Sequence, residues 1–120
     1  MKNKDRFFHI QHPLNKSSMT VFTRVTKPVV FCGFAFSHPK KDIYRRKQGN
    51  LIAQERVTCL IQAPDRHNAK ACADNFTGHS GDALISIFNE GRIEKPTMWN
   101  KIELYFDAEN RIIKARTKNS

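Results

Sequence analysis

The chain has 120 residues, of which 39% are hydrophobic, and its 21 Lys and Arg against 11 Asp and Glu give a formal net charge of +10. This length suits one domain with a substantial core, and the hydrophobic content, with nine Phe, excludes a wholly disordered chain. No apolar run reaches the roughly 18–20 residues that span a bilayer, and the basic start lacks a secretory signal, so we expect a cytoplasmic protein with no membrane partner.

The first elements expected are an arm and a hairpin. Residues 1–17 predict a flexible basic arm, with at most a short strand over Phe7–Ile10. Residues 19–26, MTVFTRVT, alternate in the manner of a β-strand, and residues 29–36, VVFCGFAF, are rich in β-branched and aromatic residues. Because Lys27-Pro28 interrupts the pattern between them, these two segments predict an antiparallel hairpin.

A basic helix is predicted next, over about 41–56, with Pro39 near its start and Ser37 or Asp42 near its cap. Gly49 lies inside this helix. Since Gly costs about 1 kcal/mol relative to Ala in a helix, its presence indicates close packing or a bend.

The residues after the basic helix predict a further strand and two helices. VTCLIQ (57–62) is typical of a buried strand, and residues 64–73 favour a short helix. A second short helix is predicted over about 81–90, capped by Ser80 and stopped by Gly91.

The C-terminal segments KIELYF (101–106) and RIIKART (111–117) alternate around DAEN and predict a hairpin. Their apolar residues also fit a helix over 98–115, which is the competing prediction. We therefore expect an α+β fold with one domain over residues 18–117. A small, mostly antiparallel sheet would carry the basic helix on one face.

Positive charge is concentrated in the first half of the chain. Residues 1–60 hold 12 Lys and Arg against 3 Asp and Glu, whereas residues 61–120 hold 9 against 8. Such asymmetry is the electrostatic footprint of a protein that meets polyanions, so nucleic acid, either DNA or RNA, is the first partner we expect. An acidic surface on another protein is the alternative partner.

The charge is densest in SHPKKDIYRRKQG (37–49), where cations crowd a predicted helix start that the amide dipoles already make positive. Each such cation is unfavourable by about 0.3–1 kcal/mol, whereas a bound phosphate would remove the repulsion and accept from the free N–H groups. A solvated face screened by salt is the simpler explanation. We predict phosphate contacts from Lys40, Lys41, Arg45, Arg46 and Lys47.

Neighbouring residues would extend this interface. Arg24 and Lys27, with Lys16, would carry it onto the first hairpin, and Arg56 would lengthen it along the helix. Tyr44 would stack on a base, unless its ring packs in the core.

The segment GFAF (33–36) partly matches the octapeptide of RNA-recognition domains, in which exposed sheet aromatics stack on bases. Cys32 stands where that octapeptide begins with Lys or Arg, and residues 37–39 depart from its aliphatic and aromatic end. Core packing of Phe34 and Phe36 is therefore the favoured interpretation.

Metal binding and catalysis have little support in the sequence. The cysteines at 32, 59 and 72 form no C-x-x-C pair, so we expect reduced thiols, two of them in strand cores. Cys59, His67, Cys72 and His79 are too irregularly spaced for a structural zinc site, and we expect no metal or cofactor. No nucleotide-binding or hydrolase motif occurs, so we expect no enzyme; an RNase-like activity would use His38 as acid or base.

One run of residues resembles a known pattern; it comprises Ser37, Pro39, Asp42, Tyr44, Arg46-Lys47, Gly49, Ile52-Ala53 and Arg56. It is similar to a pattern found in small basic proteins of uncharacterised activity that phages and mobile elements encode. In that pattern, a strand is followed by the motif S-P-x-D-x-aromatic-x-K-K-x-G-x-x-I-A-x-x-R. The chain departs from the pattern by one inserted residue around 38–41, and by Asn50 at a commonly basic position. The resemblance implies a phage or plasmid origin, action in a host cytoplasm, and one recurring element that contains Arg46, Lys47, Gly49 and Arg56.

We therefore expect a small basic accessory protein of phage or plasmid type that binds nucleic-acid phosphates with low sequence specificity. The alternative is a phage-encoded inhibitor whose basic face docks on an acidic surface of a host protein. The third hypothesis is the RNase-like enzyme.

Overall fold

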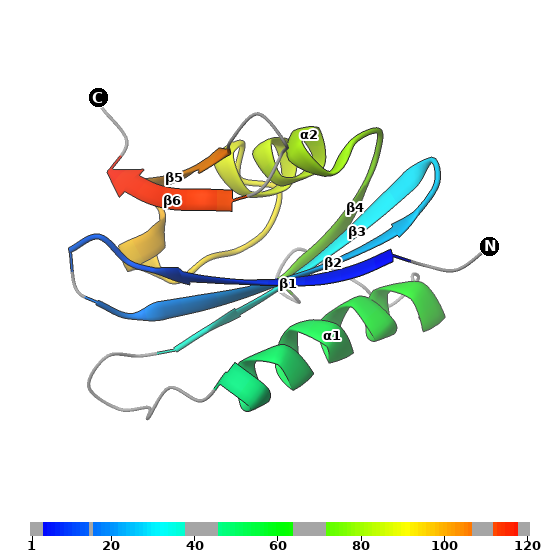
Figure 1. Ribbon diagram of the computed structural model, residues 1–120, viewed down its shortest axis with the longest axis horizontal. Helices are drawn as coiled ribbons and strands as arrows, with labels where there is room; N and C mark the ends of the chain where they lie inside the picture. Colours follow the sequence, from blue (N-terminus) through cyan, green and yellow to red (C-terminus); the bar gives the residue numbers. More distant parts are fainter. Residues whose placement is uncertain (1–3, 15, 38–45, 64–71, 107–111, 118–120) are drawn as a thin grey trace.

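A four-stranded antiparallel sheet of order β1-β2-β3-β4 forms the middle of the molecule (Figure 1). The computed structural model describes residues 4–14, 16–37, 46–63, 72–106 and 112–117. The strands are β1 (Lys4–Gln11), β2 (Ser18–Thr26), β3 (Val29–Phe36) and β4 (Ala73–Thr77). The long helix α1 (Arg46–Gln62) covers one face of this sheet, packing against β2, β3 and β4.

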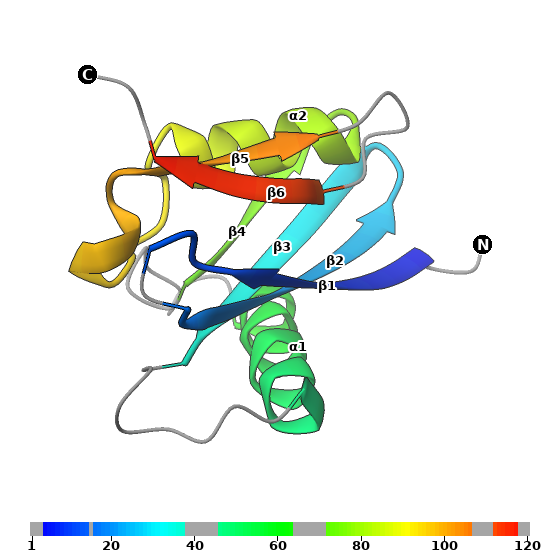
Figure 2. The same ribbon diagram turned by 60° about the vertical axis from the view of Figure 1, so that its left-hand side comes forward.

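The opposite side of the sheet faces the C-terminal third of the chain (Figure 2). This C-terminal layer contains α2 (Ser80–Leu84), the π-helical segment Ile85–Asn89, the 3₁₀-helical turn Thr97–Trp99, and the antiparallel pair β5 (Ile102–Phe106) and β6 (Ile112–Thr117). The expected α+β fold is confirmed.

Alternation along the strands gives each face of the sheet its own core, because successive strand residues point to opposite faces. Toward the C-terminal layer, Met19, Val21, Val30, Cys32 and Phe34 pack with Leu84, Ile87, Phe88, Trp99 and Leu104. Toward α1, a smaller core contains Phe22, Ala35, Ala53 and Val57. The sheet is therefore buried on both faces along β2 and β3.

Two glycines let α1 lie close to the sheet. A Cβ on Gly33 would overlap the carbonyl oxygen of Ala53, and one on Gly49 would overlap Oγ1 of Thr20. Close packing, one of the two explanations expected for Gly49, is therefore confirmed.

The prediction of a strand over 57–62 is wrong, because these residues form the C-terminal part of α1. Ala53 and Val57 are four residues apart and both enter the core beneath the helix, so the packing of one helical face overrides the β preference of VTCLIQ. The strand that follows α1 is β4, paired with β3. Residues 41–45 and most of the helix expected at 64–73 lie outside the described residues.

The expected basic arm is also corrected. Residues 4–11 form β1, which pairs with β2 along its whole length, and Ile10 is buried in the core of the C-terminal layer. The short strand expected over Phe7–Ile10 is thus present, and it is longer than predicted.

The remaining elements follow the prediction more closely. The first hairpin is β2 and β3, and the C-terminal hairpin is β5 and β6, so the competing helix over 98–115 is wrong. The helix expected over 81–90 is α2 continued by the π-helical segment, with Ser80 as its first residue and Gly91 after its end at φ 76°. Within the described part of the chain, no helix has the length and apolar character to cross a membrane.

Candidate nucleic-acid interface

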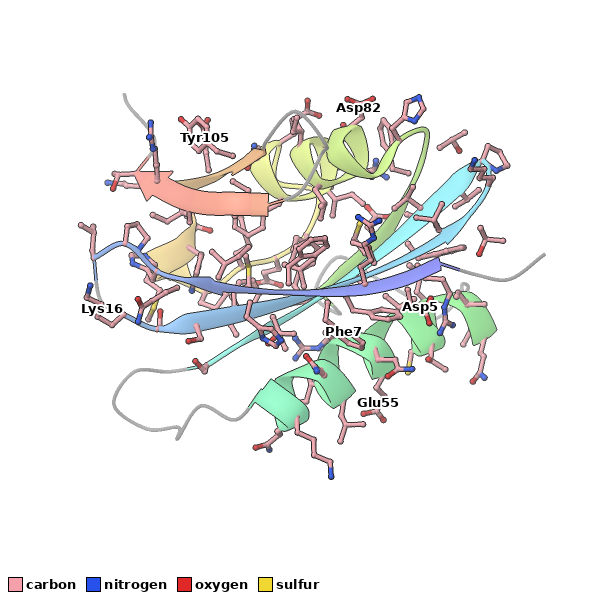
Figure 3. The ribbon with its side chains drawn as sticks, viewed as in Figure 1. Asp5, Phe7, Lys16, Glu55, Asp82 and Tyr105 are labelled. Atoms are coloured by element: carbon pink, nitrogen blue, oxygen red, sulfur yellow. The ribbon has the colours of Figure 1, made fainter. Side chains whose placement is uncertain are left out.

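The first turn of α1 is basic and holds no carboxylate. The helix begins at Arg46, and the side chain of Lys47 is exposed. The backbone N–H groups of a first helical turn have no partner within the helix and point outward as donors. Exposed Lys16, on the turn between β1 and β2, lies at the same end of the molecule (Figures 1 and 3). We call Lys16, Arg46 and Lys47 the basic end.

Ser37 does not cap the helix, since α1 begins nine residues later in the sequence. Its hydroxyl accepts a hydrogen bond from the amide of Ser18 at 3.0 Å, and its own amide donates to the carbonyl of Ser18 at 2.9 Å. Ser37 thus fastens the end of β3 to the start of β2, directly before the stretch that carries most of the predicted phosphate contacts.

The turn between β2 and β3 carries exposed Lys27 at the other end of the sheet from the start of α1 (Figure 1). Thr20, which touches Gly49 in the first turns of α1, precedes Lys27 by seven strand residues, or about 23 Å. The structure therefore does not bring Lys27 together with Lys47.

Arg24 is engaged within the protein. Its Nε donates to Oδ1 of Asp5 at 2.9 Å and its Nη2 donates to Oδ2 at 3.0 Å, which makes the pair bidentate. The hydrogen bonds to Asp5 raise the pKa of the Arg24 guanidinium. Its charge is thereby neutralised locally.

Arg56 turns toward the sheet. Its Nη1 donates to the carbonyl oxygen of Phe34 in β3, and its side chain is only partly exposed. Of the residues predicted to contact phosphate, Arg24 and Arg56 therefore bond to groups of the protein itself. The side chain of Lys47, in contrast, is exposed to solvent at the start of α1. Lys40, Lys41, Tyr44 and Arg45 lie outside the described residues, as does the side chain of Arg46.

The aromatics of β3 pack in the core, as the favoured interpretation expected. Phe34 is fully buried against Phe88, and Phe36 packs on Trp99. An exposed aromatic lies instead on β1; it is Phe7, which the sequence predicted to lie in the arm. The exposure of Phe7 could have been inferred from the sequence, because Phe8 and Ile10 alternate toward one face of a strand and leave Phe7 on the other face.

The structure describes three of the four candidate metal ligands. Cys59 is exposed on α1 rather than buried in a strand, Cys72 is half-buried before β4, and His79 is exposed; His67 lies outside the described residues. Among the residues whose positions are described, no three His, Cys, Asp or Glu side chains form a metal-binding group. Burial raises the pKa of the Cys72 thiol, against the opposing effect of nearby Arg56.

His12 is bonded within the protein on both sides of its ring. His12 is buried; its Nδ1 accepts from the amide of Leu14 at 3.1 Å, and its Nε2 then carries the proton and donates to the carbonyl of Met98 at 2.8 Å. His38, the expected acid or base of an RNase-like site, lies outside the described residues.

Comparison of the chain with protein-family models, with curated proteins and with solved structures finds no match.

Proposed function

We propose that this protein binds nucleic acid through the phosphates, with low sequence specificity, at the basic end. The observation that carries the proposal is the start of α1, where Arg46 and Lys47 stand in a first turn without a carboxylate. Like charges at a positive helix end are unfavourable unless an anion occupies it. Contacts to phosphate alone carry no base identity, so sequence specificity is expected to be low.

The surrounding sequence supports the same end. Lys40, Lys41 and Arg45 immediately precede Arg46 in the chain and remain sequence-based candidates for further phosphate contacts. The resemblance to small basic proteins of phages and mobile elements suggests an accessory role in a host cytoplasm.

The test is fluorescence anisotropy with labelled 20-nucleotide single strands and duplexes of DNA and RNA, at 50 and 200 mM salt. Lys47→Glu should weaken binding and make the slope of log affinity against log salt shallower by about 0.7 for single strands or 0.9 for duplexes, because one phosphate contact is lost. Lys27→Glu changes the net charge equally at the opposite end and should leave the slope unchanged.

Two results would contradict the proposal. If no oligonucleotide is retained at low salt, the chain does not bind nucleic acid. If Lys27→Glu weakens binding as much as Lys47→Glu, the attraction comes from net charge and not from the basic end. Capture of one acidic host protein after nuclease treatment, together with no oligonucleotide binding, would favour the inhibitor hypothesis.

A further inference from the structure

β1 is an edge strand of the sheet, and its surface on the α1 side lies outside the strands against which α1 mainly packs. Asp5, Phe7 and His9 alternate onto the face that carries α1, whereas α1 packs against β2, β3 and β4. Figure 3 shows Asp5 and Phe7 on this side, with Phe7 between β1 and α1. Phe7 is 38% exposed. We call Asp5, Phe7 and His9 the β1 strip.

The ring of Phe7 is supported from beneath. It lies 4.9 Å from the ring of Phe22, centroid to centroid, at an angle of 44°. Phe22 is fully buried in the core under α1, so it cannot turn away. A ring with one side held and another exposed to solvent is the platform on which sheet proteins stack unpaired bases.

The charges along the β1 strip are compatible with a polyanion. Both carboxylate oxygens of Asp5 accept hydrogen bonds from Arg24, so the one acid of the strip is neutralised. At the other end of the strip, Nδ1 of His9 lies 3.4 Å from Oγ1 of Thr20, which contacts the first turns of α1 at Gly49. The strip therefore leads from Phe7 toward the basic end.

From this arrangement we infer that the nucleic acid is single-stranded, with one base stacked on Phe7 while the basic end holds the backbone. The inference rests on the proposed function and specifies its ligand. In a duplex, both faces of each base are covered by its neighbours, so the ring of Phe7 has nothing to stack on; a single strand offers free base faces.

The test measures the anisotropy of a labelled 12-nucleotide oligo-dT and of a 12-base-pair duplex with the full chain. Phe7→Leu keeps an apolar side chain on Phe22 but removes the flat ring, and Phe7→Tyr keeps the ring. Phe7→Leu should weaken oligo-dT binding by about 5- to 150-fold and leave duplex binding unchanged. Phe7→Tyr should bind as the wild type does. Thermal unfolding of both variants establishes that they are folded.

The outcomes separate the inference from the proposed function. If oligo-dT is bound and Phe7→Leu binds it as well as the wild type, stacking on Phe7 is disproved and phosphate binding stands. If the wild type prefers the duplex, the single-strand assignment is overturned. If neither ligand is bound, the proposed function fails and the inference fails with it. If Phe7→Leu loses binding to oligo-dT but not to the duplex, and Phe7→Tyr binds as the wild type does, the result supports both the inference and the proposed function.

Discussion

Gly33 determines how near α1 comes to the sheet. The first atom that a Cβ there would meet is a backbone oxygen, that of Ala53, so relief requires the helix to move and not merely a side chain to turn. We expect Gly33→Ala to lower the free energy of unfolding by about 1–3 kcal/mol, the usual effect of overpacking. Urea denaturation followed by circular dichroism measures the change.

Gly91 is the matched control, because nothing lies within 4 Å of a Cβ built there and only its φ of 76° favours glycine. Gly91→Asn should change stability little, since Asn tolerates this conformation. A Gly33→Ala variant as stable as the wild type would mean that α1 is not held at this distance.

Cys32 links stability to alkaline pH. Its thiol is fully buried, and this burial, aided by the charge of Asp74, raises its pKa far above the ordinary value of 9.0. In the unfolded chain the thiol ionises near that ordinary value while the folded protein keeps its proton. The stabilising contribution is therefore complete at lower pH and is lost as the pH rises above about 9.

Between pH 8 and 10 this effect amounts to about 1.4 kcal/mol. Urea unfolding of the wild type and of Cys32→Ala at both pH values gives the comparison. The variant should be less stable at pH 8 but should lose about 1.4 kcal/mol less on going to pH 10. Cys72, whose thiol pKa is also raised by burial, is present in both proteins. Equal losses would show that Cys32 does not ionise on unfolding.

Single residues of the candidate interface were only partly predictable. The exposure of Lys47 follows from its place in a basic stretch. The pairing of Arg24 with Asp5 depends on the register of β1 with β2, which brings together residues that are 19 positions apart. Because residues 1–17 were predicted to be an arm, neither this register nor the exposed ring of Phe7 was predicted.

Among the elements, the turn after β1 is held to the C-terminal layer by His12. The imidazole bonds to Leu14 and Met98 and lies edge-on to Trp99 at 4.9 Å between ring centroids. His12→Phe would keep a ring beside Trp99 and leave the Leu14 amide and the Met98 carbonyl without these partners. We expect a loss of about 1–3 kcal/mol for each group left unsatisfied.

Thermal unfolding tests this tie, with His79→Phe as the control at an exposed histidine, which should stay within about 0.5 kcal/mol of the wild type. The Leu14 amide should also exchange its hydrogen faster in His12→Phe. Unchanged stability of that variant would mean that the turn and the 3₁₀-helical segment are held together by apolar packing alone.

The errors around α1 and β4 have physical causes. The β-branched residues in 57–62 favour a strand locally. However, Ala53 and Val57, which pack against the sheet, are four residues apart, and this spacing buries both side chains only if the segment is helical. The strand that follows the helix is β4, whose sequence ADNFT has only one large apolar residue and gives little strand signal. Its pairing with β3 supplies what its composition lacks.

At the scale of the whole molecule, the α+β class was predictable because two hairpins and one long helix carry strong patterns. The layering was not predictable, since a continuous apolar run such as VVFCGFAF indicates that a strand is buried on both faces but not which distant segment covers each face. The C-terminal layer reaches the sheet through contacts such as Phe34 with Phe88 and Phe36 with Trp99, more than 50 residues apart.

The division of the interior by the sheet also determines what an optical probe can detect. The only tryptophan, Trp99, is fully buried among His12, Phe36 and Phe88, on the side away from α1. The fluorescence emission of Trp99 therefore reports whether the C-terminal layer is packed against the sheet. Partial detachment of α1 would leave the indole emission unaltered while the far-ultraviolet ellipticity declined, so recording both signals resolves the melting of the two sides.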